Sequence, residues 1–109
     1  MAETPAPPLA GAQDEVAELL SDLIRIDTTN TGDTTTSAGE RAAAEWVACT
    51  LADVGIESEI HESERGRASL VARIEGADRS RPALLVHGHL DVVPADPAEW
   101  SVHPFSGEE

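Results

Sequence analysis

The sequence of 109 residues has few basic residues, few aromatic residues and a single cysteine. Seven basic residues stand against 21 acidic ones, which gives a net charge of −14. A field of that sign repels phosphate backbones and anionic lipid headgroups, so we expect neither nucleic-acid binding nor binding to a membrane surface. Because Cys49 is the only cysteine, no disulfide can form within the chain.

Tyrosine is absent, and the aromatic residues are Trp46, Trp100 and Phe105. The core must therefore consist mainly of Leu, Ile, Val and Ala. Hydrophobic residues make up 40% of the chain, which is ordinary for a globular protein. No run of about 18 apolar residues occurs, and the first residues lack the pattern of a signal peptide. We expect a cytoplasmic protein without a membrane span.

The first residues, 1–11, are rich in proline and alanine and are predicted to form a disordered tail. Residues 12–109 are expected to be structured. A helix is predicted over Gln13–Arg25, because apolar residues recur there at helical spacing. The stripe comprises Val16, Leu19, Leu20, Leu23 and Ile24.

A second helix is predicted to begin near Ser37, where Ser37 and Glu40 have the spacing of a capping box. Its inner face would carry an apolar stripe, and Gly55 would end it. The stripe comprises Ala43, Trp46, Val47, Thr50, Leu51 and Val54. Cys49 lies within this helix and is expected to be a buried, unreactive thiol.

Three strands are predicted after these helices. Residues 56–61 and 69–75 alternate apolar and polar side chains, and 62–67 is a polar turn. Residues 83–86 form a continuous apolar run, which is typical of a strand covered on both faces. This order predicts an α/β fold with a mixed sheet and helices packed on it. From His87 onward the chain is expected to be irregular, at the sheet edge where open α/β sheets bind ligands.

The first irregular residues hold His87, His89 and Asp91 at a spacing of two. In extended backbone that spacing places all three side chains on one face. Imidazole and carboxylate groups together suit Zn²⁺ and similar metals. An Asp near a liganding His also suits the role of orienting the imidazole. The spacing alone leaves a metal site and an ordinary polar loop equally open.

A longer pattern surrounds these residues. Gly88-His89-Leu90-Asp91-Val92-Val93-Pro94, then Trp100, then Pro104-Phe105-Ser106-Gly107, resembles the first metal motif of a family of two-metal hydrolases. The family comprises the aminoacylases, acetylornithine deacetylases, succinyl-diaminopimelate desuccinylases and carboxypeptidase G. The segment Leu23 to Asn30 resembles the end of the first helix and the following loop in that family. The resemblance extends from about Gln13 to the end of the chain.

The resemblance implies that the chain is the N-terminal part of a truncated catalytic domain of the zinc exopeptidase type. His89 aligns with the first metal ligand, and Asp91 aligns with the catalytic-site carboxylate that orients its imidazole. The implied reaction is hydrolysis of an amide or peptide bond, in N-acyl amino acids or dipeptides, by a metal-activated water. The implied cofactor is zinc, as two ions, with cobalt or manganese as alternatives. A homodimer is implied for the full-length form, and the 109 residues alone are expected to be inactive.

Two alternatives of other classes remain open. A metallo-β-lactamase-like hydrolase would use His87, His89 and Asp91, but it would also expect a histidine where Val92 stands. A non-enzymatic small α/β module would have kept the start of the fold and lost the chemistry. The remaining chemistry-bearing residues are interpreted as surface or loop residues: His61, His103, Glu108 and Glu109.

Overall fold

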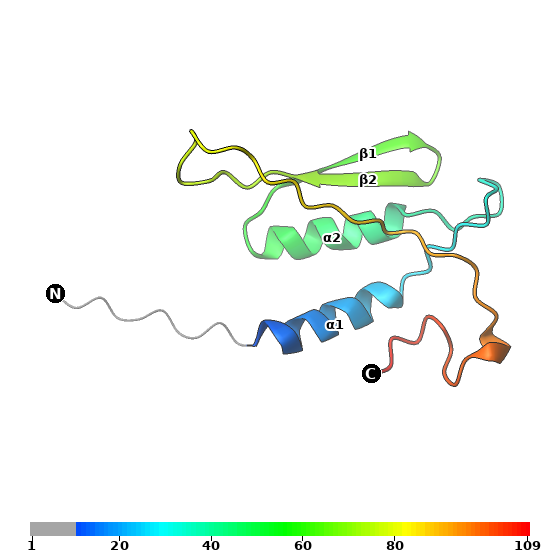
Figure 1. Cartoon of the computed structure of the whole chain (residues 1–109). Coiled ribbons are helices and arrows are strands. Elements are labelled where there is room, and N and C mark those ends of the chain that lie inside the picture. The colour runs from blue at the N-terminus through cyan, green and yellow to red at the C-terminus, as the bar shows by residue number, and fades with distance from the viewer. Residues whose placement is uncertain (1–10) are drawn as a thin grey trace.

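The computed structural model describes residues 11–109 as two helices, one β-hairpin and a long irregular segment (Figure 1). The predicted tail lies outside the described residues except for Gly11. The elements are α1 (Ala12–Ile24), α2 (Arg41–Asp53), β1 (Ser58–Glu64), β2 (Arg67–Ala72) and the 3-10 turn η1 (Pro97–Glu99). The prediction of α1 is confirmed to within one residue at each end. No helix in residues 11–109 is long and apolar enough to cross a membrane.

The hairpin of β1 and β2 packs against α2 (Figure 1). The strands are antiparallel, with Ile60 opposite Leu70. They are joined by a tight turn at Arg65-Gly66, where Gly66 has a φ of +81°. The buried apolar residues of the described chain are all alanines, namely Ala43, Ala44 and Ala68. Small side chains let the helix and the sheet approach closely, so this layer holds the core.

The start of α2 differs from the prediction. The helix begins at Arg41 with Glu40 as its N-cap, and no side chain caps it. Ser37 instead donates to the carbonyl of Asp33. The physical reason lies at Gly39, whose φ of +80° interrupts the helix. A Cβ at Gly39 would lie 2.7 Å from the carbonyl oxygen of Gly66, so the hairpin turn presses directly on this residue.

The end of α2 confirms the prediction. Gly55 has a φ of +80°, and its amide donates to the carbonyl of Ala52 at 2.9 Å. The amide of Ile56 donates to the carbonyl of Leu51, also at 2.9 Å. These two bonds form a Schellman motif, in which a glycine at the left-handed position lets the chain turn back toward β1.

The predicted buried strand at 83–86 is wrong for this structure. These residues form no ladder, and Leu84, Leu85 and Val86 are more than 80% exposed. The sheet has only the two antiparallel strands, so the mixed sheet is also absent from the described residues. A strand covered on both faces needs a neighbouring strand and a layer on each side, whereas these residues are unpaired and exposed. The α/β character itself is confirmed.

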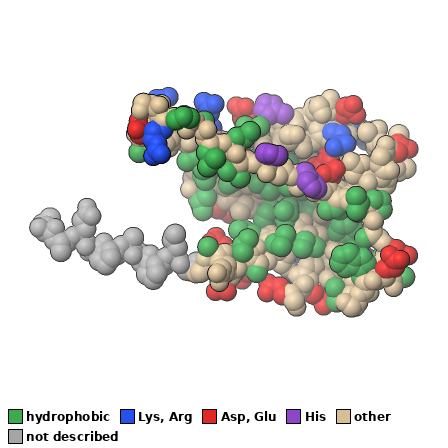
Figure 2. Space-filling view, in the orientation of Figure 1, with side chains coloured by type: hydrophobic (Ala, Val, Ile, Leu, Met, Phe, Trp, Pro, Cys, Tyr) green, Lys and Arg blue, Asp and Glu red, His purple; other side chains and the backbone are tan. Residues whose placement is uncertain are grey.

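Helix α1 runs below α2, on the side opposite the hairpin (Figure 1). Its predicted stripe is only partly covered, since Val16 and Leu20 are more than half exposed. Figure 2 shows hydrophobic side chains open to solvent across the middle of the molecule, on the face that Figure 1 also presents. Val54, the C-cap of α2, is exposed, and the prediction of a buried Cys49 is wrong because that residue is exposed. The core is correspondingly small.

Candidate functional site

The predicted site segment is held by the loop after α1. Thr28, which is 4% exposed, donates from its hydroxyl to the carbonyl of Leu90 at 2.7 Å. The amide of Val92 donates to the carbonyl of Thr28 at 3.2 Å, and the amide of Asn30 donates to the carbonyl of Val92 at 2.8 Å. Thr29 and Val92 thereby form a parallel bridge. These contacts fix the backbone on both sides of Asp91.

Local side-chain bonds give this loop its shape. The carboxylate of Asp27 accepts from the hydroxyl and the amide of Thr29, at 2.6 and 2.9 Å. The hydroxyl bond and then the amide bond stabilise the charged carboxylate, so they hold the pKa of Asp27 below its ordinary value. The side-chain oxygen of Asn30 accepts from the amide of Gly32 at 2.9 Å. The amide nitrogen of Asn30 is therefore turned the other way, toward the site.

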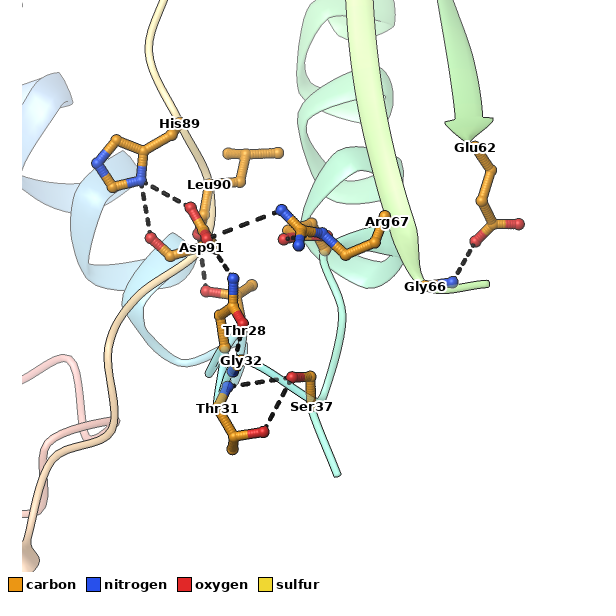
Figure 3. Close-up of polar contacts among 12 residues, drawn as sticks. Thr28, Thr31, Gly32, Ser37, Glu62, Gly66, Arg67, His89, Leu90 and Asp91 are labelled. Atoms are coloured by element: carbon orange, nitrogen blue, oxygen red, sulfur yellow. Dashed lines mark hydrogen bonds and ion pairs between the residues drawn. The ribbon is translucent and has the colours of Figure 1, made fainter. Parts of the chain in front are cut away.

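Asp91 lies at the centre of the polar contacts drawn in Figure 3. Its Oδ2 accepts from Nδ2 of Asn30 at 2.9 Å, and Nη2 of Arg67 lies 4.0 Å from the same oxygen. Its Oδ1 lies 2.9 Å from Nδ1 of His89. The bond from Asn30 and then that from His89 lower the pKa of Asp91, and the charge of Arg67 lowers it further. The carboxylate is thus ionised at neutral pH.

The contacts of His89 indicate which of its two ring nitrogens carries the proton. Its Nδ1 lies 2.9 Å from Oδ1 of Asp91 and 2.9 Å from the main-chain oxygen of the same residue. Both of these oxygens are acceptors, so the contacts favour the tautomer that carries its proton on Nδ1. In the neutral ring, Nε2 then presents a lone pair. The side chain is 84% exposed, which leaves that nitrogen accessible to a ligand.

An ion pair with the buried Glu40 supports Arg67. Glu40 is 5% exposed, and its Oε1 lies 3.1 Å from Nε of Arg67. The other oxygen, Oε2, is buried without a hydrogen-bond partner among the described residues. The amide of Glu40 donates to the carbonyl of Gly66 at 2.8 Å, which ties the start of α2 to the hairpin turn. Arg67 therefore links the junction of α2 and the hairpin turn to Asp91.

These groups line an open cleft of about 670 Å³ between the hairpin, α2 and the segment 88–91. The lining combines the charged groups of the ion pair with apolar side chains. The lining residues are Glu40, Val47, Ser63, Glu64, Arg67, Ala68, Ser69, Leu70, Gly88, His89, Leu90 and Asp91.

The structure brings His89 and Asp91 together but not His87. His87 forms no hydrogen bond or ion pair with either residue in the described chain. Residues 11–109 contain no group of three or more His, Cys, Asp or Glu side chains placed to hold a metal ion. His61 is exposed, as predicted, and lies 3.3 Å from a carboxylate oxygen of Glu59. His103 and the two terminal glutamates are also exposed.

Sequence reasoning missed three contributors, namely Asn30, Glu40 and Arg67. Asn30 falls in a loop whose composition indicates only a turn. Glu40 is predicted to complete a capping box with Ser37, whereas its carboxylate pairs with Arg67 across the fold. Arg67 was placed at the end of a polar turn. No local pattern reports such contacts, because they join residues 24 to 61 positions apart.

The downstream part of the motif docks on α1. The hydroxyl of Ser21 donates to the carbonyl of Gly107, and Nε of Arg25 donates to the carbonyl of Ser106 at 3.2 Å. A Cβ at Gly107 would lie 2.6 Å from the carbonyl oxygen of Ser21, so only glycine fits there. This contact returns the chain to α1 after η1.

Comparison with known proteins finds related sequences. The chain is 31% identical over 96 residues to an N-fatty-acyl-amino acid synthase/hydrolase of Xenopus tropicalis, covering 87% of this chain and 19% of that protein. It is 30% identical over 92 residues to an acetylornithine deacetylase of Aliivibrio salmonicida, covering 84% and 24% respectively. An acetylornithine deacetylase of Vibrio atlanticus is 31% identical over 89 residues, covering 82% and 23%.

The chain thus spans about a fifth to a quarter of the length of these relatives. No family model matches the chain. No solved structure matches it either.

Proposed function

We propose that this chain, which belongs to the family of aminoacylases and acetylornithine deacetylases, supplies the first metal-binding segment of a metal-dependent amide hydrolase. The observation that carries the proposal is the pair of His89 and Asp91, with Nδ1 held by two oxygens and Nε2 left open. A liganding histidine usually has its other ring nitrogen bound in this way. Residues 12–109 would be the first portion of a catalytic domain of the zinc exopeptidase type.

The donor set fits a divalent metal of the zinc class. His89 would be the ligand through Nε2, and Asp91 would orient the ring without binding the metal itself. Imidazole nitrogen suits zinc, and cobalt or manganese are alternatives. When bound, zinc supplies a Lewis acid that lowers the pKa of water and polarises an amide carbonyl.

The residues of this chain have a limited task in that reaction. Asp91 keeps the proton of His89 on Nδ1, so that Nε2 stays unprotonated and correctly oriented. Its ionised state also makes the imidazole more electron-rich. One histidine and one carboxylate do not make a two-metal centre, so the remaining ligands and the general base would come from outside these residues. The 109 residues by themselves are proposed to be inactive.

The proposed substrates are N-acyl amino acids or dipeptides. The names of the relatives support this class, since one acts on N-fatty-acyl amino acids and others on acetylornithine. Both substrates contain an acyl group joined to an amine through an amide bond. A homodimer is proposed for the complete protein.

The test compares the product of the complete reading frame that contains these residues with the 109-residue chain. Each is assayed for amine release from N-acetylornithine and from a long-chain N-acyl amino acid. We expect hydrolysis by the complete product only, lost with a chelator and restored by zinc. Hydrolysis that survives complete metal removal would contradict a metal-dependent mechanism. Hydrolysis by the 109-residue chain would contradict the division of the site.

A further inference from the structure

We propose that Asn30 and Arg67 are positioning residues that aim the carboxylate of Asp91 at His89, with the buried Glu40 holding Arg67 in place. Their role as support for a metal ligand rests on the proposed function. Neither residue contacts a reacting atom, so each would act only through Asp91.

The carboxylate of Asp91 is used on two sides. Asn30 and Arg67 both approach Oδ2, at 2.9 and 4.0 Å, whereas His89 approaches Oδ1 at 2.9 Å. A carboxylate that is held at one oxygen cannot rotate freely at the other. The side chain of Asp91 is 27% exposed, so water competes for it less than for a surface carboxylate. The second oxygen is therefore presented to the imidazole in one orientation.

Hydrogen bonds hold both the side chain and the backbone of Asn30. Its Oδ1 accepts from Gly32 at 2.9 Å, and its backbone amide donates to the carbonyl of Val92 at 2.8 Å. The hydrogen bond from the backbone amide of Asn30 to Val92 keeps Asn30 beside the segment that carries Asp91. The bond to Gly32 determines which end of the side-chain amide faces the carboxylate. Only the donor end is available to Asp91.

Arg67 is held from behind by Glu40. Nε of Arg67 lies 3.1 Å from Oε1 of Glu40, while Nη2 points to Asp91 (Figure 3). A guanidinium presents several donors in a fixed planar fork, so one arginine can serve both carboxylates. Glu40 is only 5% exposed, and its backbone amide donates a hydrogen bond to the carbonyl of Gly66 in the hairpin turn. Arg67 is therefore attached through Glu40 to the junction between the start of α2 and the hairpin turn.

The consequence falls on the proton of His89. An oriented carboxylate favours the tautomer with hydrogen on Nδ1 and a lone pair on Nε2. Without orientation, the ring would hold its proton on Nε2 more of the time, so metal binding at Nε2 would first require that proton to move. The inference thus concerns the metal-free state and can be measured in the chain as it stands.

The experiment measures the ¹⁵N shifts of the two ring nitrogens of His89 by NMR at neutral pH, without metal. We expect the Nδ1–H form to predominate in the unmodified chain. Asn30→Ala should lower the ratio of Nδ1–H to Nε2–H forms by roughly two- to tenfold, the change that corresponds to one lost hydrogen bond. Arg67→Gln should lower it less, because its contact is longer. Arg67→Lys keeps the charge and should retain more of the ratio than Arg67→Gln.

The matched control is Arg65→Gln, which removes the same charge from an exposed turn residue with no ion pair in the described chain. It should leave the ratio unchanged. Amide shifts of β1 and β2 report whether each variant still folds. In an Asp91→Ala background, Asn30→Ala should have no additional effect, since it acts only through that carboxylate.

A predominant Nε2–H form, or a ratio that folded Asn30→Ala and Arg67→Gln leave unchanged, would overturn the inference. If that result accompanied metal-dependent hydrolysis by the complete product, the proposed function would stand without the positioning. If the ratios changed as expected but hydrolysis needed no metal, the positioning of His89 would be supported and the proposed function would fail.

Discussion

The hairpin with α2 and the segment 83–107 are ordered in different ways. The first unit combines an antiparallel β-ladder with buried alanines and a close backbone approach between Gly39 and Gly66. The second unit has almost no regular structure, and it is held at two places, by the loop after α1 and by α1 itself. The comparison shows that the chemistry-bearing segment takes its geometry from distant side chains rather than from its own secondary structure.

The largest expected effect concerns the unit formed by the hairpin and α2. Gly39→Ala should destabilise the fold by about 2–4 kcal/mol, because the residue has positive φ and the new Cβ would meet the carbonyl of Gly66. Gly55→Ala has the same φ but open space and should cost about 1 kcal/mol. Gly76→Ala meets no atom within 4 Å and should be close to neutral. Urea denaturation measures all three, and equal effects would contradict the close contact.

The next effect concerns the corner that joins the two units. Glu40→Ala should cost about 1–2 kcal/mol, less than the roughly 3–5 kcal/mol typical of a broken buried ion pair. The reduction is expected because Arg67 is 43% exposed and remains hydrated after its partner is lost. Arg41→Ala is the control, since it breaks an exposed pair with Glu45. A control as destabilising as Glu40→Ala would show that the buried pair contributes little.

A smaller effect concerns the anchored segment. In hydrogen exchange, the amide of Val92 should exchange at least about tenfold more slowly than those of Leu84 and Leu85, which lack backbone partners in the described chain. Thr28→Val removes the bond from the hydroxyl to Leu90 and should reduce the protection of Val92 by about two- to tenfold. Protection at Leu84 equal to that at Val92 would mean that the segment is held along its whole length.

The smallest effect is a dependence on acid. The pKa of Asp27 lies below its ordinary value of 3.8 in the folded chain, because Thr29 bonds to the charged form. The stability that the Asp27 carboxylate contributes is therefore fully present above pH 3.8 and is lost as the pH falls through the folded pKa. Asp27→Asn should lose slightly less stability than the unmodified chain between about pH 5 and pH 2. Glu18→Gln, which changes a carboxylate without a hydrogen bond in the described chain, serves as the control. An identical acid response in Asp27→Asn and the unmodified chain would contradict the effect.

Local patterns predicted the helices well. The stripe of α1 gave its bounds to within one residue, and Gly55 marked the end of α2 because a left-handed turn needs glycine. The same local reasoning failed at Ser37 and Glu40. Their spacing fits a capping box, but the contact between Gly39 and Gly66 moved the start of α2 to Arg41.

The site was predictable only in part. The spacing of His89 and Asp91 brought these residues to attention, and the structure shows them in contact, while their role in metal binding stays a prediction. The strand predicted at 83–86 depended on neighbours that its own sequence does not specify. Asn30 and Arg67 lie near Asp91 only after the chain has folded, so no pattern of spacing could identify them.

The most direct test of the central claim compares His89→Ala with His87→Ala in the product of the complete reading frame. Bound zinc and amide hydrolysis are measured for each variant after the same purification. We expect His89→Ala to lose zinc from the site together with nearly all activity, while His87→Ala retains both. Loss of zinc and activity in His87→Ala, or their full retention in His89→Ala, would contradict it.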